Sequence, residues 1–156
     1  MVIDKIDREI LARLLQDSRV SFQEIARDLI ISGGTVHVRV NKMKEAGIIK
    51  GSKIMLDFER LGLKVCAFIG VNLANARDLK SALEKLKKMP EIVDVHYTTG
   101  QYRLFVKVVT ESTQKLHLFL IEKLQAIPEI QSTETFISLD NPLNRDVQIP
   151  AGEINS

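Results

Sequence analysis

Apolar residues recur at helical spacing along the first third of the chain. Asp4 is suited to capping a first helix, which is predicted to end near residues 17–19. The inward positions of that helix are Ile6, Ile10, Leu11 and Leu14. Residues 21–24, Ser-Phe-Gln-Glu, have the pattern of a capping box and predict the start of a second helix. The inward positions of the second helix are Phe22, Ile25 and Leu29.

A third helix is predicted over residues 33–46, after a short break at residues 30–32. Ser32 can cap its first turn, and Gly47 can end it. Its inward face is expected to hold Val36, Val40 and Met43. Two helices joined by a tight turn, the second with a polar and basic outer face, are typical of a helix-turn-helix domain, here of the winged-helix-like type. We therefore interpret the third helix as the one that enters the major groove.

The outer face of this third helix carries side chains that can contact DNA. Arg39 can make a bidentate contact with a guanine edge, and Val38 can meet a thymine methyl group. His37 and Thr35 can reach a base or a phosphate, whereas lysines suit phosphates, which position a protein without reading sequence. The glycines at positions 33 and 34 keep the start of the helix narrow where it approaches DNA. The predicted DNA-contacting set is Ser32, Thr35, His37, Val38, Arg39, Lys42, Lys44 and Lys50.

The charge of the chain is unevenly distributed. The net charge is +2, but residues 1–56 carry ten basic and seven acidic side chains, whereas residues 57–156 carry a net −1. The stretch 32–53 holds five basic residues and one acidic residue. A local excess of positive charge favours a phosphate-facing surface. The competing interpretation is an ordinary solvated helix face, and the capped helix and short turn before it favour DNA.

The remaining two thirds alternate between the periods of strands and helices. The predicted strands are 65–73, 92–98, 103–110 and 130–139, and the predicted helices are 76–88 and a second one that is capped by Ser112 and ends before Pro128. This βαββαβ order predicts a ferredoxin-like domain, an antiparallel sheet with both helices on one face. The whole chain therefore belongs to the α+β class.

The first of these strands is apolar on both faces. One face presents Val65, Ala67, Ile69 and Val71, and the other presents Cys66, Phe68 and Gly70. Because the helices cover only one face, the other is expected to pack against the sheet of a second copy in a homodimer. RNA-recognition modules share the βαββαβ order. Residues 102–108 lack the glycine-aromatic pattern of those modules, and the chain has only eight aromatic residues, so RNA binding is disfavoured.

Four segments carry a resemblance to a known family: residues 3–11 (IDKIDREIL), 36–49 (VHVRVNKMKEAGII), 97–102 (YTTGQY) and 131–135 (QSTET). On these segments, the whole chain from Asp4 to about Arg145 resembles the Lrp/AsnC family of bacterial and archaeal regulators. Residues 37–40 and 131–135 are more similar to its asparagine-responsive branch than to its leucine-responsive one. The resemblance implies a regulator that binds promoter double-stranded DNA as a dimer-based assembly, often an octamer, with amino-acid effector sites between dimers.

The same resemblance implies where the effector binds. The expected pocket residues are Thr98, Thr99, Gly100, Gln101, Tyr102, Gln125, Thr133 and Thr135. Backbone N–H groups of the hairpin can take an α-carboxylate, and glutamine or threonine side chains can read an amide, which favours asparagine. Many members have an acidic residue where this chain has Arg103, so the manner in which the α-amino group is held does not carry over.

Several classes of function are excluded or disfavoured. The three histidines are scattered and no paired carboxylates accompany them, so we expect no enzymatic activity, no catalytic residues, no cofactor beyond the amino acid and no metal. The single cysteine and the lack of a long apolar run indicate a cytoplasmic protein without a membrane span. An effector-independent DNA-architectural protein stays open. The predicted divisions are a DNA-binding domain with a connector strand (1–56), a linker (57–63), a sensor and dimerisation domain (64–145) and a tail (146–156).

Overall fold

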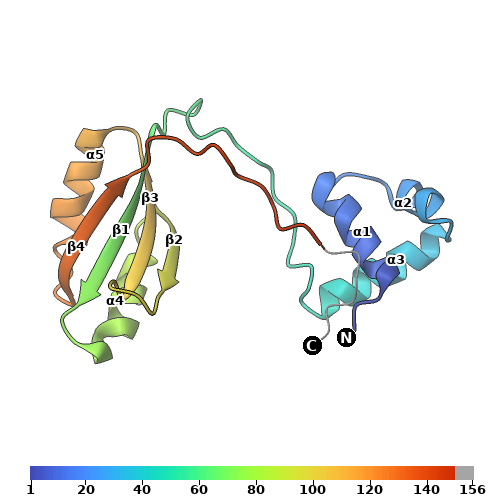
Figure 1. Ribbon diagram of the computed structural model, residues 1–156, viewed down its shortest axis with the longest axis horizontal. Coiled ribbons are helices and arrows are strands. Elements are labelled where there is room, and N and C mark those ends of the chain that lie inside the picture. Colours follow the sequence, from blue (N-terminus) through green and yellow to red (C-terminus); the bar gives the residue numbers. More distant parts are fainter. Residues whose placement is uncertain (150–156) are drawn as a thin grey trace. The chain divides into compact units, whose positions relative to one another are not determined.

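The computed structural model describes residues 1–149 and divides the chain into two compact units (Figure 1). Residues 1–55 form one unit together with the segment that begins at Leu143, and residues 56–142 form the other. The last three residues assigned to the sensor domain from sequence, 143–145, thus group with the helical unit. Residues 150–156 of the expected tail lie outside the described residues.

Three helices build the first unit: α1 (Lys5–Gln16), α2 (Phe22–Leu29) and α3 (Gly33–Glu45). Each begins at a side-chain cap, namely Asp4, Ser21 and Ser32, whose oxygen accepts a backbone N–H from the first turn. The reciprocal capping box, however, lies at Asp4 and Asp7 of α1. At Ser21 the structure has only the bond from the Glu24 N–H to the serine oxygen, so the box expected there is half formed.

The core of this unit is formed by the inward positions expected from the periodicity. Val36, Val40 and Met43 of α3 are fully buried against Ile10 of α1 and Ile25 of α2. After α3, Gly47 adopts a left-handed φ of 72°, as a helix C-terminal glycine does. The connector strand expected within residues 47–56 is wrong, because residues 49–57 have no regular secondary structure.

The second unit is a four-stranded antiparallel sheet in the order β2-β3-β1-β4. Its strands are β1 (Val65–Leu73), β2 (Ile92–Tyr97), β3 (Leu104–Thr110) and β4 (Ile130–Ile137). A short 3-10 turn (Ala76–Asp78) leads into α4 (Leu79–Leu86), and α5 (Thr113–Leu118) continues into a π-helix (Phe119–Leu124). The sequence predicted a single helix after Ser112 and did not foresee this change of helix type.

Both helical segments cover the same face of the sheet. The core consists of Ala67, Ile69 and Val71 of β1 and alternate residues of β3, packed under Leu86, Leu116, Phe119 and Leu124. The sequence predicted that the helices cover one face of β1, and the structure shows that it is the face of Ala67, Ile69 and Val71. The ferredoxin-like βαββαβ order and the three-helix N-terminal unit therefore agree with the expected fold class.

Candidate functional site

The exposed side of α3 forms a shallow depression beside the start of α1. Ser32, Thr35, Val38 and Lys42, which are predicted DNA contacts, line this depression together with Arg39. The spacing of 35, 38 and 42 places these side chains on one stripe of the helix. Val38 is 52% exposed although it is apolar, and the Lys42 ammonium has no ion-pair partner within residues 1–149. This stripe presents an apolar group, hydroxyls and a cation to the solvent.

Arg39 lies differently from the expectation for a free, base-reading side chain. Its Nη1 donates to Oδ2 of Asp4 at 2.6 Å and to Oδ1 of Asp7 at 2.8 Å. The Asp7 side chain is only 3% exposed, and that of Arg39 is 26% exposed. Two carboxylates at the start of α1 therefore occupy Nη1, and the guanine contact expected of Arg39 stays a prediction. In this arrangement Arg39 joins α3 to the first turn of α1.

The protonation equilibria of this cluster follow from its hydrogen bonds. The Asp7 backbone N–H and then the Arg39 guanidinium lower the pKa of Asp4. The hydrogen bonds to Asp7 and Asp4 raise the pKa of Arg39 further above its ordinary value. Both shifts favour the charged forms of Asp4 and Arg39.

Three other predicted DNA contacts lie outside the stripe. The ring of His37 packs edge-on against Phe22 of α2 at a centroid distance of 5.9 Å, and its Nδ1 lies 3.3 Å from the Asn41 amide nitrogen. Lys44 and Lys50 line a different groove, with apolar residues of α1 and Ile149 of the C-terminal segment. The structure thus gathers five of the eight predicted residues and places three elsewhere on the unit.

The two glycines at the start of α3 face different surroundings. A Cβ added at Gly33 would lie 3.6 Å from Cγ of Gln23, in ordinary contact with α2. Gly34 lines the depression instead, and a Cβ there would meet only the Ser32 oxygen, at 3.8 Å. Packing among residues 1–149 therefore leaves room for a Cβ at either glycine.

The residues expected to bind the effector gather at one end of the sheet but on different faces. Residues 98–103 form the hairpin between β2 and β3, in which the Thr98 hydroxyl donates to the Tyr102 carbonyl, and Thr99, Gly100 and Gln101 are exposed. In β4, Thr133 pairs with Val71 and Thr135 with Ile69, which places both threonines on the helix-covered face. Gln125 is exposed just after the π-helix. In a single chain this site is open to solvent.

Tyr102 lies on the opposite face of the sheet from those threonines. A Cβ built on Gly70 of β1 would lie 2.4 to 2.7 Å from three carbons of the Tyr102 ring, so only glycine leaves room for it. The ring also contacts Phe105 and Phe136 at centroid distances of 6.3 Å. The hairpin aromatic is therefore folded back onto the sheet.

The same open face carries an aromatic cluster that the sequence reasoning missed. Phe68 stacks on Phe105 at 6.1 Å, Phe105 meets Phe136 at 6.3 Å, and the Lys107 ammonium lies over the Phe68 ring. Each of these aromatic residues belongs to a different strand, so the cluster is visible only once the strand order is known. The alternation of side chains between the two faces of each strand was the sequence signal that could have placed these aromatic residues on one face.

Two features are absent from residues 1–149, a metal-binding cluster and a membrane-spanning helix. No three His, Cys, Asp or Glu side chains come together there in an arrangement that can hold a metal ion. No helix in this part of the chain is long and apolar enough to cross a membrane.

Comparison with known protein families gives a match for each unit. Residues 3–50 match the winged helix-turn-helix DNA-binding family, and residues 66–147 match the Lrp/AsnC ligand binding domain. The regulatory protein AsnC of Haemophilus influenzae is 47% identical over 146 residues, covering 94% of this chain and 97% of that protein. Its counterpart in Escherichia coli K12 is 46% identical over 147 residues, with the same coverage.

Solved structures give the same result for the fold. The structure of Escherichia coli AsnC aligns with a TM-score of 0.92 and 45% identity, covering 95% of this chain and 99% of that one. A transcriptional regulator from Neisseria meningitidis, solved as a complex with L-Met, aligns with a TM-score of 0.87 over 94% of this chain and 96% of that one. Its 22% identity indicates a shared fold.

Proposed function

The chain belongs to the Lrp/AsnC family of DNA-binding transcription regulators, and we propose that a free amino acid, with asparagine as the favoured effector, controls its binding to DNA. The observation that carries this proposal is the pairing, in one chain, of a helix-turn-helix that has an exposed polar and basic stripe on α3 with a separate ligand-binding domain. The proposed activity is the regulation of transcription rather than catalysis. The proposed location is the cytoplasm.

On the DNA side, α3 enters the major groove with the stripe of Thr35, Val38 and Lys42. Thr35 and Val38 read base edges, and Lys42 contacts a phosphate, because a hydroxyl and an apolar group can discriminate bases whereas a flexible ammonium acts as a point charge. Ser32 holds the first turn of α3 through its bond to the Thr35 N–H, 3.0 Å long. Arg39 holds the orientation of α3 through Asp4 and Asp7. His37, Lys44 and Lys50 contribute at the edge of the contact.

On the effector side, the hairpin and the start of β4 form the amino-acid site. The exposed backbone of Thr99, Gly100 and Gln101 takes the α-carboxylate, while Gln125 and the β4 threonines Thr133 and Thr135 read the side-chain amide. Thr98 and Tyr102 fix the shape of the hairpin. The complex of the Neisseria meningitidis regulator with L-Met supports an amino acid as the ligand class. Because the site is open in a single chain, a neighbouring copy closes it.

The open face of the sheet is the proposed homodimer interface. Phe68, Phe105 and Phe136 form an apolar surface there, with Phe136 43% exposed, and monomers rarely leave such a surface uncovered. A dimer also supplies the two-fold symmetry that paired DNA half-sites require, and four dimers form the expected octamer. Phe136→Glu is expected to shift the mass measured by light scattering toward the monomer. Ile121→Glu, at an exposed residue of the π-helix, is the control.

The experiment that tests the effector is a thermal-shift panel of the twenty amino acids on the purified protein. A ligand at 100 times its dissociation constant stabilises the folded state by about 2.7 kcal/mol. A shift with asparagine that also changes the affinity for promoter DNA supports the proposal. The second candidate, an effector-independent architectural protein, predicts no shift at millimolar concentrations and DNA binding that no amino acid alters.

A further inference from the structure

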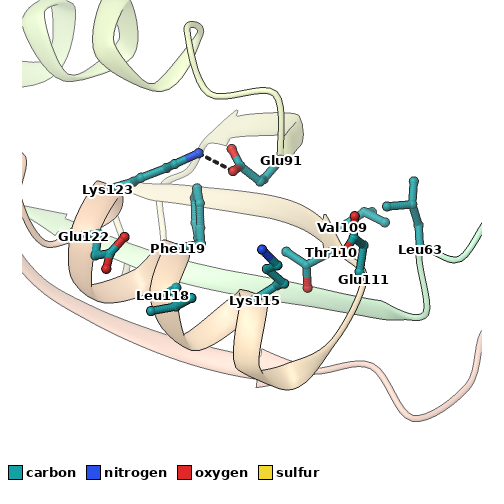
Figure 2. Close-up of a pocket in the computed structure, with 10 residues that line it drawn as sticks. All are labelled: Leu63, Glu91, Val109, Thr110, Glu111, Lys115, Leu118, Phe119, Glu122 and Lys123. Carbon is teal, nitrogen blue, oxygen red and sulfur yellow. Dashed lines mark hydrogen bonds and ion pairs between the residues drawn. The ribbon is translucent and has the colours of Figure 1, made fainter.

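A cavity of about 320 Å³ opens on the sensor domain at the end of the sheet where β3 leads into α5 (Figure 2). It lies away from the effector hairpin. Its wall includes Thr110, which pairs with Val65 at the start of β1, whereas the hairpin adjoins Leu104, which pairs with Val71. Six residues of extended strand separate these positions, about 20 Å at 3.3 Å per residue. The volume falls in the range of small-molecule sites, about 300–1,000 Å³.

One wall of the cavity carries a largely buried carboxylate. Glu91 is 23% exposed, and its Oε1 accepts a hydrogen bond from the Lys123 ammonium (Figure 2). Its other oxygen, Oε2, is buried and has no hydrogen-bond partner within residues 1–149. Burial has the largest single effect and raises the pKa of Glu91, but the hydrogen bond from Lys123, a backbone hydrogen bond and the charge of Lys123 together outweigh it, so the pKa is lowered. Glu91 is therefore an anion at the cavity wall, with Oε1 bonded to Lys123 and Oε2 buried beneath the surface.

A second charge faces the same cavity from α5. Lys115 lines it, and in Figure 2 its ammonium lies among the lining side chains. No ion pair engages this ammonium within residues 1–149, so it is free to bind a carboxylate. Glu111 and Glu122 also line the cavity and disfavour a ligand that carries only negative charge. A zwitterion satisfies both kinds of group.

The rest of the wall supplies apolar surface. Leu63, Leu118 and Phe119 line the cavity, and Phe119 begins the π-helix, a deviation from α-helical geometry that is often found at functional sites. Leu63 also lies two residues before β1, at the end of the linker predicted over residues 57–63. A bound ligand would therefore contact the end of the linker.

We propose that this cavity is a second amino-acid site, which takes an amino acid with an apolar side chain, its α-ammonium toward Glu91 and its α-carboxylate on Lys115. The inference rests on the proposed function only for the class of ligand. It predicts a different preference from the hairpin, where polar groups read an amide. It also predicts that the ligand needs both its α-ammonium and its α-carboxylate in order to bind.

The test is calorimetric titration of the full-length protein with L-leucine, in the presence of saturating asparagine. We expect one leucine per chain to bind, and 4-methylpentanoate and isoamylamine, which each lack one charge, not to bind. Lys115→Met should weaken leucine binding about tenfold or more, as the loss of a charge-assisted contact does. Lys80→Met, at an exposed lysine of α4 outside the cavity, should leave it unchanged. Glu91→Gln is a second variant, and circular dichroism checks its fold.

Each outcome separates this inference from the proposed effector. Leucine binding that competes with asparagine and survives Lys115→Met would overturn the second site and leave the asparagine site intact. An absence of leucine binding to the wild-type protein would overturn it as well. Leucine binding that depends on Lys115, in a protein that does not respond to asparagine, would support the cavity and contradict asparagine as the effector.

Discussion

Arg39 Nη1 and Asp7 Oδ1 lie 2.8 Å apart although 32 residues separate them in the sequence, and their ion pair joins the recognition helix to the first turn of α1. Asp7 is almost fully buried and depends on Arg39 to balance its charge, whereas Arg39 also pairs with Asp4 and is partly exposed. Asp7→Ala is expected to lower the free energy of unfolding by about 2–3 kcal/mol, which includes its capping bond to the Asp4 N–H and is less than the roughly 3–5 kcal/mol of a fully buried pair because Arg39 keeps Asp4 and some solvent. Urea denaturation measures this change.

The matched control for this prediction is another ion pair of the same unit. Asp28 pairs with Arg13 at 3.4 Å and is 54% exposed. Asp28→Ala should cost less than about 1 kcal/mol, as surface pairs do. Equal losses in the two variants would mean that the buried pair has no special role in holding α3.

Lys42 is expected to contact a phosphate from the exposed stripe of α3. Lys42→Ala should weaken binding to every duplex alike and reduce the slope of log affinity against log salt by about one. Filter binding or fluorescence anisotropy at several salt concentrations measures both quantities. Lys80→Ala removes a lysine from the sensor domain and should leave the slope unchanged. A loss confined to one DNA sequence would assign base recognition to Lys42 instead.

Gly34 lines the depression on α3, whereas Gly33 faces α2. Replacing either glycine with alanine should raise the free energy of unfolding by up to about 1 kcal/mol, because alanine loses less backbone entropy in a helix. Only Gly34→Ala should weaken DNA binding, since its new methyl group lies where the helix approaches the groove. Urea denaturation and anisotropy on both variants test this pair, and equal DNA affinities would contradict it.

Gly70 and Tyr102 are expected to be energetically coupled. Gly70→Ala forces the Tyr102 ring off the sheet and should destabilise the protein by about 1–3 kcal/mol, as overpacking does. In a background that carries Tyr102→Ala the same substitution should cost far less. A double-mutant cycle in urea measures the coupling, and additive effects would show that the ring moves aside freely.

Glu129 is held by Lys85 and Ser81 of α4, at 2.6 and 2.5 Å. These hydrogen bonds, that from Lys85 foremost, lower the pKa of Glu129 from 4.5 to about 2. The ionised carboxylate therefore stabilises the fold fully above the unfolded-state pKa, and this contribution is lost as the pH falls from 4.5 toward 2.

Lys85→Met should consequently reduce stability at neutral pH, and its difference from the wild type should shrink as the pH falls through this window. Urea midpoints measured across that range check the prediction. Lys87→Met, which breaks an exposed pair with Glu84, is the control and should show little pH dependence. A difference that stays constant with pH would contradict the role of Glu129.

Much of the fold could be predicted because its signals are local. The range 65–73 predicted for β1 is confirmed, and Val36, Val40 and Met43 are buried as their spacing indicated. Ser32 and Gly47 bound α3 as expected, since a cap acts within one helical turn. The π-helix after α5 was not predicted, because its residues have the same apolar spacing as an ordinary α-helix.

The site was less predictable, because several of its side chains depend on neighbours from distant parts of the chain. The sequence by itself determined the elements, their inward faces and the polar stripe of α3, through periodicity and capping. Only the tertiary structure decided that Arg39 turns to Asp4 and Asp7, that Tyr102 folds over Gly70, and that Thr133 lies on the opposite face of the sheet from Tyr102. These relationships depend on helix packing and strand register, which bring together residues that no local pattern links.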